Sequence, residues 1–259
     1  MENPLVKLAP QLFGDYPKAF ISLYNQVYIS PETDKAFLKE KLWKAYDYGS
    51  RYHDGQKRQS GEPYFNHCVE VASTLASWNM DYTTIMAGLL HDVVEDTKLT
   101  VDDIEKEFGE DLDNLVDGLT KISGIEFSTR KEKQAGNFMK MLLSVAKDIR
   151  VIIIKFADRM HNMRTISYLP RIKQHRIAKE TRDVYSPLAH RLGLNSIKTE
   201  LENLAFRYTE TELFNEITAK LKENQRRLTR YINKFSLPII NTLTDRGYDF
   251  EVDGRHKSP

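Results

Sequence analysis

The segment TTIMAGLLHDVVEDT, residues 83–97, decides the fold, because an apolar run changes abruptly into a cluster of polar and charged side chains. From Ile85 to Leu90 it is apolar on every side, which is typical of a helix buried between other helices. Asp81 and Thr83 are suitable residues to cap its N-terminus. The pattern predicts one buried helix that continues from this cap through VVED.

The polar end of this segment carries four side chains of the kinds that bind metals, His91, Asp92, Glu95 and Asp96. On a continuous helix, residues four apart lie on the same side, so these four would form two neighbouring stripes that face the same way. Burying so many polar groups is costly unless a partner compensates them, and a divalent cation would do so. The alternative interpretation is an acidic helix end that is simply exposed to solvent.

A second His-Asp pair, His53 and Asp54, lies at the start of HDGQKRQSGEP, residues 53–63. This segment is polar and contains two glycines, so it predicts a loop, and a surface turn is the favoured interpretation of the pair. Pro63 fits the first turn of the helix that follows.

The segment KFADRMHNMRT, residues 155–165, repeats the change from apolar to polar. It follows the apolar residues 151–154, and its Asp158, Asn162 and Thr165 fall along one face of a helix. The run VIII at 151–154, taken alone, could equally be a buried strand.

The strongest candidates for a metal site are two histidines and two aspartates: His67, His91, Asp92 and Asp158. Taken singly, His67 is more simply a hydrogen-bonded core histidine, and Asp158 an arginine partner or a helix cap. As a set they offer nitrogen and oxygen ligands, which suit manganese, iron or zinc better than magnesium or calcium. The donor types do not choose among these metals.

Helical periodicity covers most of the remaining chain and predicts an all-α, multi-helical fold. The stretch SGIEFSTRKEKQAG, residues 123–136, has no apolar period and is expected to be mobile, with a helix resuming over 137–150. Further helices are expected from Asp34 to near Tyr52, at TVDDIEKEFG with its end at Gly109, and over an amphipathic run from Thr211 to Gly247. Residues 248–259, YDFEVDGRHKSP, look like the beginning of an extended segment.

Composition narrows the possible functions. The net charge of +1 and the absence of a long basic block argue against a nucleic-acid groove. The single cysteine, Cys68, excludes a disulfide within the chain and indicates the reducing cytoplasm. No run of about 18 apolar residues is present, and the N-terminus lacks the apolar core of a signal peptide, so we expect neither export nor a membrane span.

These motifs resemble the HD hydrolase domain of the Rel/SpoT family, the enzymes that make and degrade the alarmone (p)ppGpp. The resemblance runs from about Ala45 to Tyr208 through GQKRQSGEPYFNH, TIMAGLLHDVVEDT, FGEDLDNLVDGLTK, IKFADRMHNMRT and YSPLAHRLGLNSIKTELENLAF, in the family's order. It implies an HD-type metal-dependent hydrolase domain at 1–195, a helical linker at 196–247 and the truncated start of a synthetase domain at 248–259. The chain is thus expected to be part of a longer bifunctional enzyme.

The resemblance also implies a chemistry, with manganese bound by the four ligands named above. Glu95 and Asp96 would position and deprotonate a water that attacks the 3'-diphosphate of (p)ppGpp, giving GDP or GTP and pyrophosphate. The residues expected to grip the nucleotide precede His67 or follow Asp158: Arg58, Gln59, Ser60, Tyr64, Asn162 and Thr165.

Three positions depart from the family pattern: Gln59 replaces a basic residue, Cys68 replaces a proline, and Gly136 replaces a glutamate. The first departure is expected to weaken substrate binding. Two other functions stay open, namely an HD-type hydrolase of another nucleotide, such as NADPH or a deoxynucleotide, and a non-catalytic module that senses the alarmone. Retention of both the His-Asp and the Glu-Asp pairs favours a working hydrolase.

Overall fold

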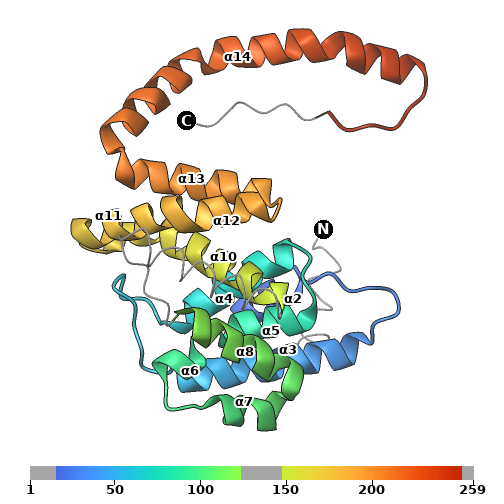
Figure 1. The fold of residues 1–259 in the computed structure, drawn as a ribbon. Helices are drawn as coiled ribbons and strands as arrows, with labels where there is room; N and C mark the ends of the chain where they lie inside the picture. Colours follow the sequence, from blue (N-terminus) through green and yellow to red (C-terminus); the bar gives the residue numbers. More distant parts are fainter. Residues whose placement is uncertain (1–15, 124–147, 253–259) are drawn as a thin grey trace. The chain divides into compact units, whose positions relative to one another are not determined.

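The computed structural model describes residues 16–123 and 148–252, and within these ranges the chain is helical (Figure 1). No strand occurs in the described residues, where an isolated bridge joins Lys57 to Pro63. The all-α prediction is therefore confirmed. The predictions for residues 124–147, a mobile stretch and the beginning of a helix, lie outside the described residues.

The chain divides into two compact units, Met1–Leu169 and Pro170–Pro259. In order, the first unit contains α2 (Lys18–Tyr24), α3 (Lys35–Tyr52), α4 (Phe65–Ser77), α5 (Tyr82–Leu90), α6 (Val93–Asp96), α7 (Val101–Phe108), α8 (Glu110–Ser123), α10 (Ile149–Arg164) and the 3-10 turn η1 (Ile166–Tyr168).

Helix α5 is the centre of the first unit. It packs against α3, α4, α8 and α10, and every residue from Thr84 to Leu90 is buried. Gly88 allows α4 to approach closely, because a Cβ atom there would lie 2.6 Å from Cδ1 of Leu75. The apolar run that predicted a buried helix therefore forms the core that supports the polar segment after it.

Side-chain caps fix the starts of the helices around this core. Asp34 accepts from the backbone N–H of Ala36 at the start of α3, and Asp81 accepts from that of Thr84 at the start of α5. Asp148 accepts from the backbone N–H of Arg150 and so caps α10. The apolar run 151–154, which could have been a strand, is thus part of α10.

The predicted continuous helix through VVED is wrong. Helix α5 ends at Leu90, His91 and Asp92 form a turn, and the short α6 follows. Nδ1 of His91 hydrogen-bonds the carbonyl oxygen of Gly88 at 2.8 Å, the acceptor that the backbone N–H of Asp92 would use in a continuous helix. The two ligand-type residues consequently lie in a turn rather than on a helical stripe.

The second unit consists of α11 (Arg171–Glu180), the π-helical segment η2 (Thr181–Tyr185), α12 (Ser186–Arg191), α13 (Asn195–Thr209) and the long α14 (Thr211–Asp245). The predicted amphipathic run from Thr211 is thus a helix. Residues 248–252, expected to begin an extended segment, form no strand. Among the described residues, no helix combines the length and the apolar character needed to span a bilayer.

Candidate metal centre

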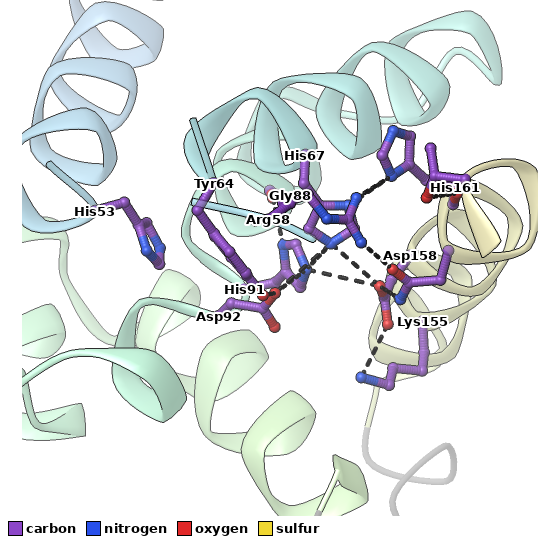
Figure 2. Close-up of polar contacts among 12 residues, drawn as sticks. His53, Arg58, Tyr64, His67, Gly88, His91, Asp92, Lys155, Asp158 and His161 are labelled. Atoms are coloured by element: carbon purple, nitrogen blue, oxygen red, sulfur yellow. Dashed lines mark hydrogen bonds and ion pairs between the residues drawn. The ribbon is translucent and has the colours of Figure 1, made fainter. Parts of the chain in front are cut away.

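Three separate parts of the first unit bring the predicted ligands together (Figure 2). His67 comes from α4, His91 and Asp92 from the turn after α5, and Asp158 from α10. Nε2 of His67 lies 3.2 Å from Nε2 of His91 and 3.3 Å from Oδ1 of Asp158. The ligand atoms of His67, His91 and Asp158 all lie within 4.8 Å of one another.

Asp92 lies beside this cluster of three residues. Its Oδ2 atom is 3.0 Å from Nε2 of His91 and 3.6 Å from Nε2 of His67. The same oxygen accepts a hydrogen bond from the hydroxyl of Tyr64 at 2.7 Å. Asp92 is therefore placed to act as a fourth ligand, with Tyr64 fixing the direction of its carboxylate.

The cluster is buried and strongly coupled electrostatically. His67 and His91 are 2% and 1% exposed, and Asp158 is 5% exposed. Burial lowers the pKa of His67. Burial also acts to lower the pKa of His91, but the carboxylate of Asp92 outweighs it and raises that pKa to about 9. A positive charge is thus stable at this point of the protein.

The hydrogen bonds of His91 allow a test of whether a cation fits. A carbonyl oxygen can only accept, so Nδ1 of His91 donates to Gly88, and Nε2 of the neutral ring keeps its lone pair. That lone pair faces Nε2 of His67 with two carboxylates alongside. Lone pairs and carboxylates that lie this close together in a buried site need a cation or a proton between them. The residues therefore fit a divalent metal ion held by nitrogen and oxygen.

The oxygens of Asp158 have different partners. Oδ1 faces the histidines and accepts from the side-chain amide of Asn162, while Oδ2 lies 3.1 Å from Nζ of Lys155. Burial acts to raise the pKa of Asp158, but Lys155 and His67 outweigh it and hold that pKa well below its usual range. Asp158 is thus kept as a carboxylate, the form that binds metal.

Three of the residues predicted to bind the nucleotide, Arg58, Tyr64 and Asn162, contact the groups around the metal cluster. Arg58 donates from Nη2 to Oδ1 of Asn162 at 2.6 Å and from Nη1 to Nδ1 of His161 at 3.0 Å. Burial, and then the carboxylates of Asp92 and Asp96, raise the pKa of Tyr64 well above its usual range. A cavity of about 410 Å³ adjoins Arg58 and is also lined by His67 and His161.

The other predicted site residues lie farther out or make local contacts. Gln59 is exposed, and Ser60 donates to the carboxylate of Glu62 at 3.3 Å. The hydroxyl of Thr165 donates to the backbone oxygen of His161 at the end of α10. Glu95 and Asp96 are exposed on α6, directly after the ligand-bearing turn.

Sequence reasoning missed two residues of the centre and misplaced a third. His161 and Lys155 lie three residues on either side of Asp158 on α10, a spacing that brings side chains together and could have identified them. His53, expected in a surface turn, is only 2% exposed. Its ring stacks on that of Tyr64, and its Nδ1 atom bonds Oε1 of Gln56, so the loop folds inward here.

Comparison with known proteins agrees with this geometry. A family model described as HD domain matches residues 45–195. The GTP pyrophosphokinase of Myxococcus xanthus is 44% identical over 95% of this chain and 32% of its own length. The bifunctional (p)ppGpp synthase/hydrolase SpoT of Escherichia coli K12 is 45% identical over 84% of this chain and 31% of its own length.

A solved structure described as a metazoan ortholog of SpoT is 26% identical, with 70% of this chain and 97% of that chain covered and a TM-score of 0.48. This chain spans about a third of the length of the curated relatives. The buried His-His-Asp cluster lies inside the range that the family model matches. The chain belongs to the HD-domain family, among the HD domains of Rel/SpoT proteins.

Proposed function

We propose that this chain hydrolyses the 3'-diphosphate of (p)ppGpp, releasing pyrophosphate and leaving GDP or GTP, with manganese as its metal ion. The observation that carries the proposal is the buried convergence of His67, His91 and Asp158, with Asp92 beside them. The name of the relative from Escherichia coli K12, a (p)ppGpp synthase/hydrolase, supports the choice of substrate.

In this proposal the four residues hold one cation, His67 and His91 through their Nε2 atoms and Asp92 and Asp158 through carboxylate oxygens. A divalent ion bound there lowers the pKa of a coordinated water and neutralises charge on a phosphate. Lys155 and Asn162 hold the Asp158 carboxylate in place, and Tyr64 does the same for Asp92.

Glu95 and Asp96 are proposed to orient the attacking water and accept its proton. Their position supports this role, because α6 begins directly after Asp92 and places both residues in an exposed position. An exposed carboxylate close in the chain to the ligands can meet a water that enters the site from solvent and can take its proton.

The nucleotide is proposed to be held by Arg58, Gln59, Ser60, Tyr64, Asn162 and Thr165. Arg58 and Asn162 have the best support, because they are hydrogen-bonded to each other and Asn162 also donates a hydrogen bond to Asp158. A guanidinium can hold a phosphate through two hydrogen bonds or stack on a base. The cavity beside Arg58 has the size of a small-molecule site. Gln59, which supplies no charge, is proposed to weaken this grip.

We further propose that this domain belongs to a longer bifunctional enzyme, with 1–195 as the hydrolase domain, 196–247 as a linker and 248–259 as the start of a synthetase domain. In that enzyme the synthetase domain is the intramolecular partner. The cytoplasm is the proposed location, because the single cysteine, Cys68, indicates a reducing compartment. We expect this domain not to bind nucleic acid directly, because its positive and negative charges nearly balance.

The test is release of pyrophosphate from ppGpp by this chain with manganese, next to the same reaction in a chelator. Manganese-dependent release from ppGpp is the expected result. A parallel panel of pppGpp, NADPH and a deoxynucleoside triphosphate tests the other nucleotide substrates. Folded, metal-loaded protein that hydrolyses only another nucleotide would contradict the substrate. Binding of ppGpp without any hydrolysis would instead indicate the sensing module.

A further inference from the structure

We propose that Arg58 and His161 are positioning residues that set the tautomer of His67 and thereby direct its Nε2 lone pair toward the metal ion. This inference rests on the metal centre of the proposed function, but it is independent of the nucleotide that the enzyme hydrolyses. Neither residue is required to touch the metal ion.

The rings of His67 and His161 are in direct contact. Nδ1 of His67 lies 2.7 Å from Nδ1 of His161, so a single proton is shared on this axis and one of the two nitrogens must be the donor. The contact alone does not say which. The two residues are 94 positions apart and come from α4 and α10.

Arg58 resolves this choice. Its Nη1 atom lies 3.0 Å from the same Nδ1 atom of His161, and a guanidinium can only donate. Nδ1 of His161 therefore accepts, and the proton on the ring-to-ring axis belongs to His67. With its proton on Nδ1, neutral His67 has a bare Nε2, which is the atom that faces His91 and Asp158.

The same guanidinium also acts on a second ligand. Nη2 of Arg58 donates to Oδ1 of Asn162 at 2.6 Å, which leaves the amide nitrogen of Asn162 to donate to Oδ1 of Asp158. The Arg58 side chain, in the loop before α4, thus orients both His161 and Asn162 (Figure 2). These two residues in turn bond the ligands on α4 and α10, His67 and Asp158. Outer partners of this kind orient metal ligands and raise their affinity for the ion.

Variants of His161 provide the first test, through titration of the metal-free protein with Mn²⁺ alone and detection of free Mn²⁺ by electron paramagnetic resonance. His161→Leu removes the acceptor and is expected to weaken Mn²⁺ binding about tenfold to hundredfold. His161→Asn keeps an acceptor near the position of Nδ1 and is expected to restore most of the affinity. Arg58→Met is expected to weaken binding as well, because the tautomer of His161 is no longer fixed.

The matched control is His190→Asn, which changes an exposed histidine on α12 and should leave Mn²⁺ affinity unchanged. Equal affinities for the wild type and His161→Leu would overturn the proposal. Because no nucleotide is present, failure of ppGpp hydrolysis with normal Mn²⁺ binding would count against the proposed substrate and not against this inference.

A second measurement needs no variant and so does not depend on how well a variant folds. Long-range proton–nitrogen spectra of protein with labelled histidine report which ring nitrogen carries the proton. In wild-type protein with diamagnetic Zn²⁺ bound, His161 is expected to carry its proton on Nε2 and to have a bare Nδ1. A proton on Nδ1 of His161 would overturn the proposal.

Discussion

The Nε2 atoms of His67 and His91 face each other at 3.2 Å, although the two residues are 24 positions apart in the chain. Both rings are buried, and burial acts to lower both pKa values; it prevails at His67, whereas at His91 the carboxylates of Asp92 and Asp158 together outweigh it and raise the pKa. With the pKa of His91 near 9, a proton competes for the place where a metal ion would bind. Metal affinity and protonation are therefore coupled in this centre.

Replacement of Asp158 by alanine tests the ligand set. The variant loses the carboxylate that both histidines face, and the remaining ligands should hold the ion poorly. We expect metal content, measured by plasma mass spectrometry after desalting, to fall to background and hydrolysis to be abolished. Asp102→Asn, an exposed change on α7, is the control. Normal metal content in Asp158→Ala would remove Asp158 from the ligand set.

The acidic pair on α6 should behave differently from the ligands. Glu95→Gln and Asp96→Asn keep the shape of each side chain but remove its ability to take a proton. We expect hydrolysis to fall by about 10²- to 10⁴-fold, the usual contribution of a general base, while metal content stays normal. Single-turnover rates at saturating metal provide the measurement. A variant that loses its metal would show a ligand role, and unchanged rates in both would exclude the pair from catalysis.

Much of the fold follows from local pattern. The apolar run before His91 predicted a helix buried between others, and the structure shows the predicted helix start at Asp34 and the predicted cap at Asp81. The ligand histidines could be named because buried polar groups require partners. The break in the helix at His91 could not be predicted, because it depends on a side-chain bond to Gly88 that competes with the backbone.

The spacing around Asp158 could have marked His161 as a candidate, but the contacts that His161 and Arg58 make could not be predicted from the sequence. His161 meets His67 only because α10 packs against α4, and Arg58 reaches both His161 and Asn162 across more than a hundred positions of chain. His53 is buried because its loop folds back on Tyr64. Such contacts join segments that are far apart in the chain, and the periodicity of apolar residues within one helix does not predict them.

The stability of the metal-free protein should depend on pH through His161. Burial, with His67 and Arg58 nearby, lowers the pKa of His161 to about 3, from 6.5 in the unfolded chain. As pH falls below 6.5, His161 takes up a proton in the unfolded chain but stays neutral in the folded protein. The free energy of unfolding therefore decreases progressively as pH falls toward 3. One such group contributes at most about 1.4 kcal/mol per pH unit, and partial exposure reduces this.

Urea denaturation in a chelator between pH 6.5 and about 5.5 measures this slope, in a range about one unit above the ordinary pKa of the carboxylates. His161→Asn should show a smaller loss of unfolding free energy per pH unit than the wild type, and His190→Asn the same loss. His91 does not interfere, because its raised pKa gives stability that is present below pH 6.5 and is lost as pH rises toward 9. Identical slopes in the wild type and His161→Asn would contradict the prediction.

Gly88 connects the packing of the core to the metal centre. A Cβ atom at this position would lie 2.6 Å from Cδ1 of Leu75 and 3.4 Å from Cα of Ala72, so in Gly88→Ala either the buried Leu75 side chain or α5 itself must shift. Helix propensity favours alanine by up to about 1 kcal/mol, but overpacking costs about 1–3 kcal/mol, so a net loss of stability is expected. Because α4 carries His67 and Gly88 itself bonds His91, the Mn²⁺ affinity should fall too.

The control for Gly88→Ala is a double-mutant cycle with Leu75→Val, which removes the Cδ1 atom that the new methyl group would meet. If the clash is the cause, the double variant should be more stable than the sum of the two single effects implies, and it should regain Mn²⁺ affinity. Unfolding free energies and Mn²⁺ titrations of the four proteins provide the measurement. Strictly additive effects would show that the spacing of α4 and α5 is not what Gly88 sets.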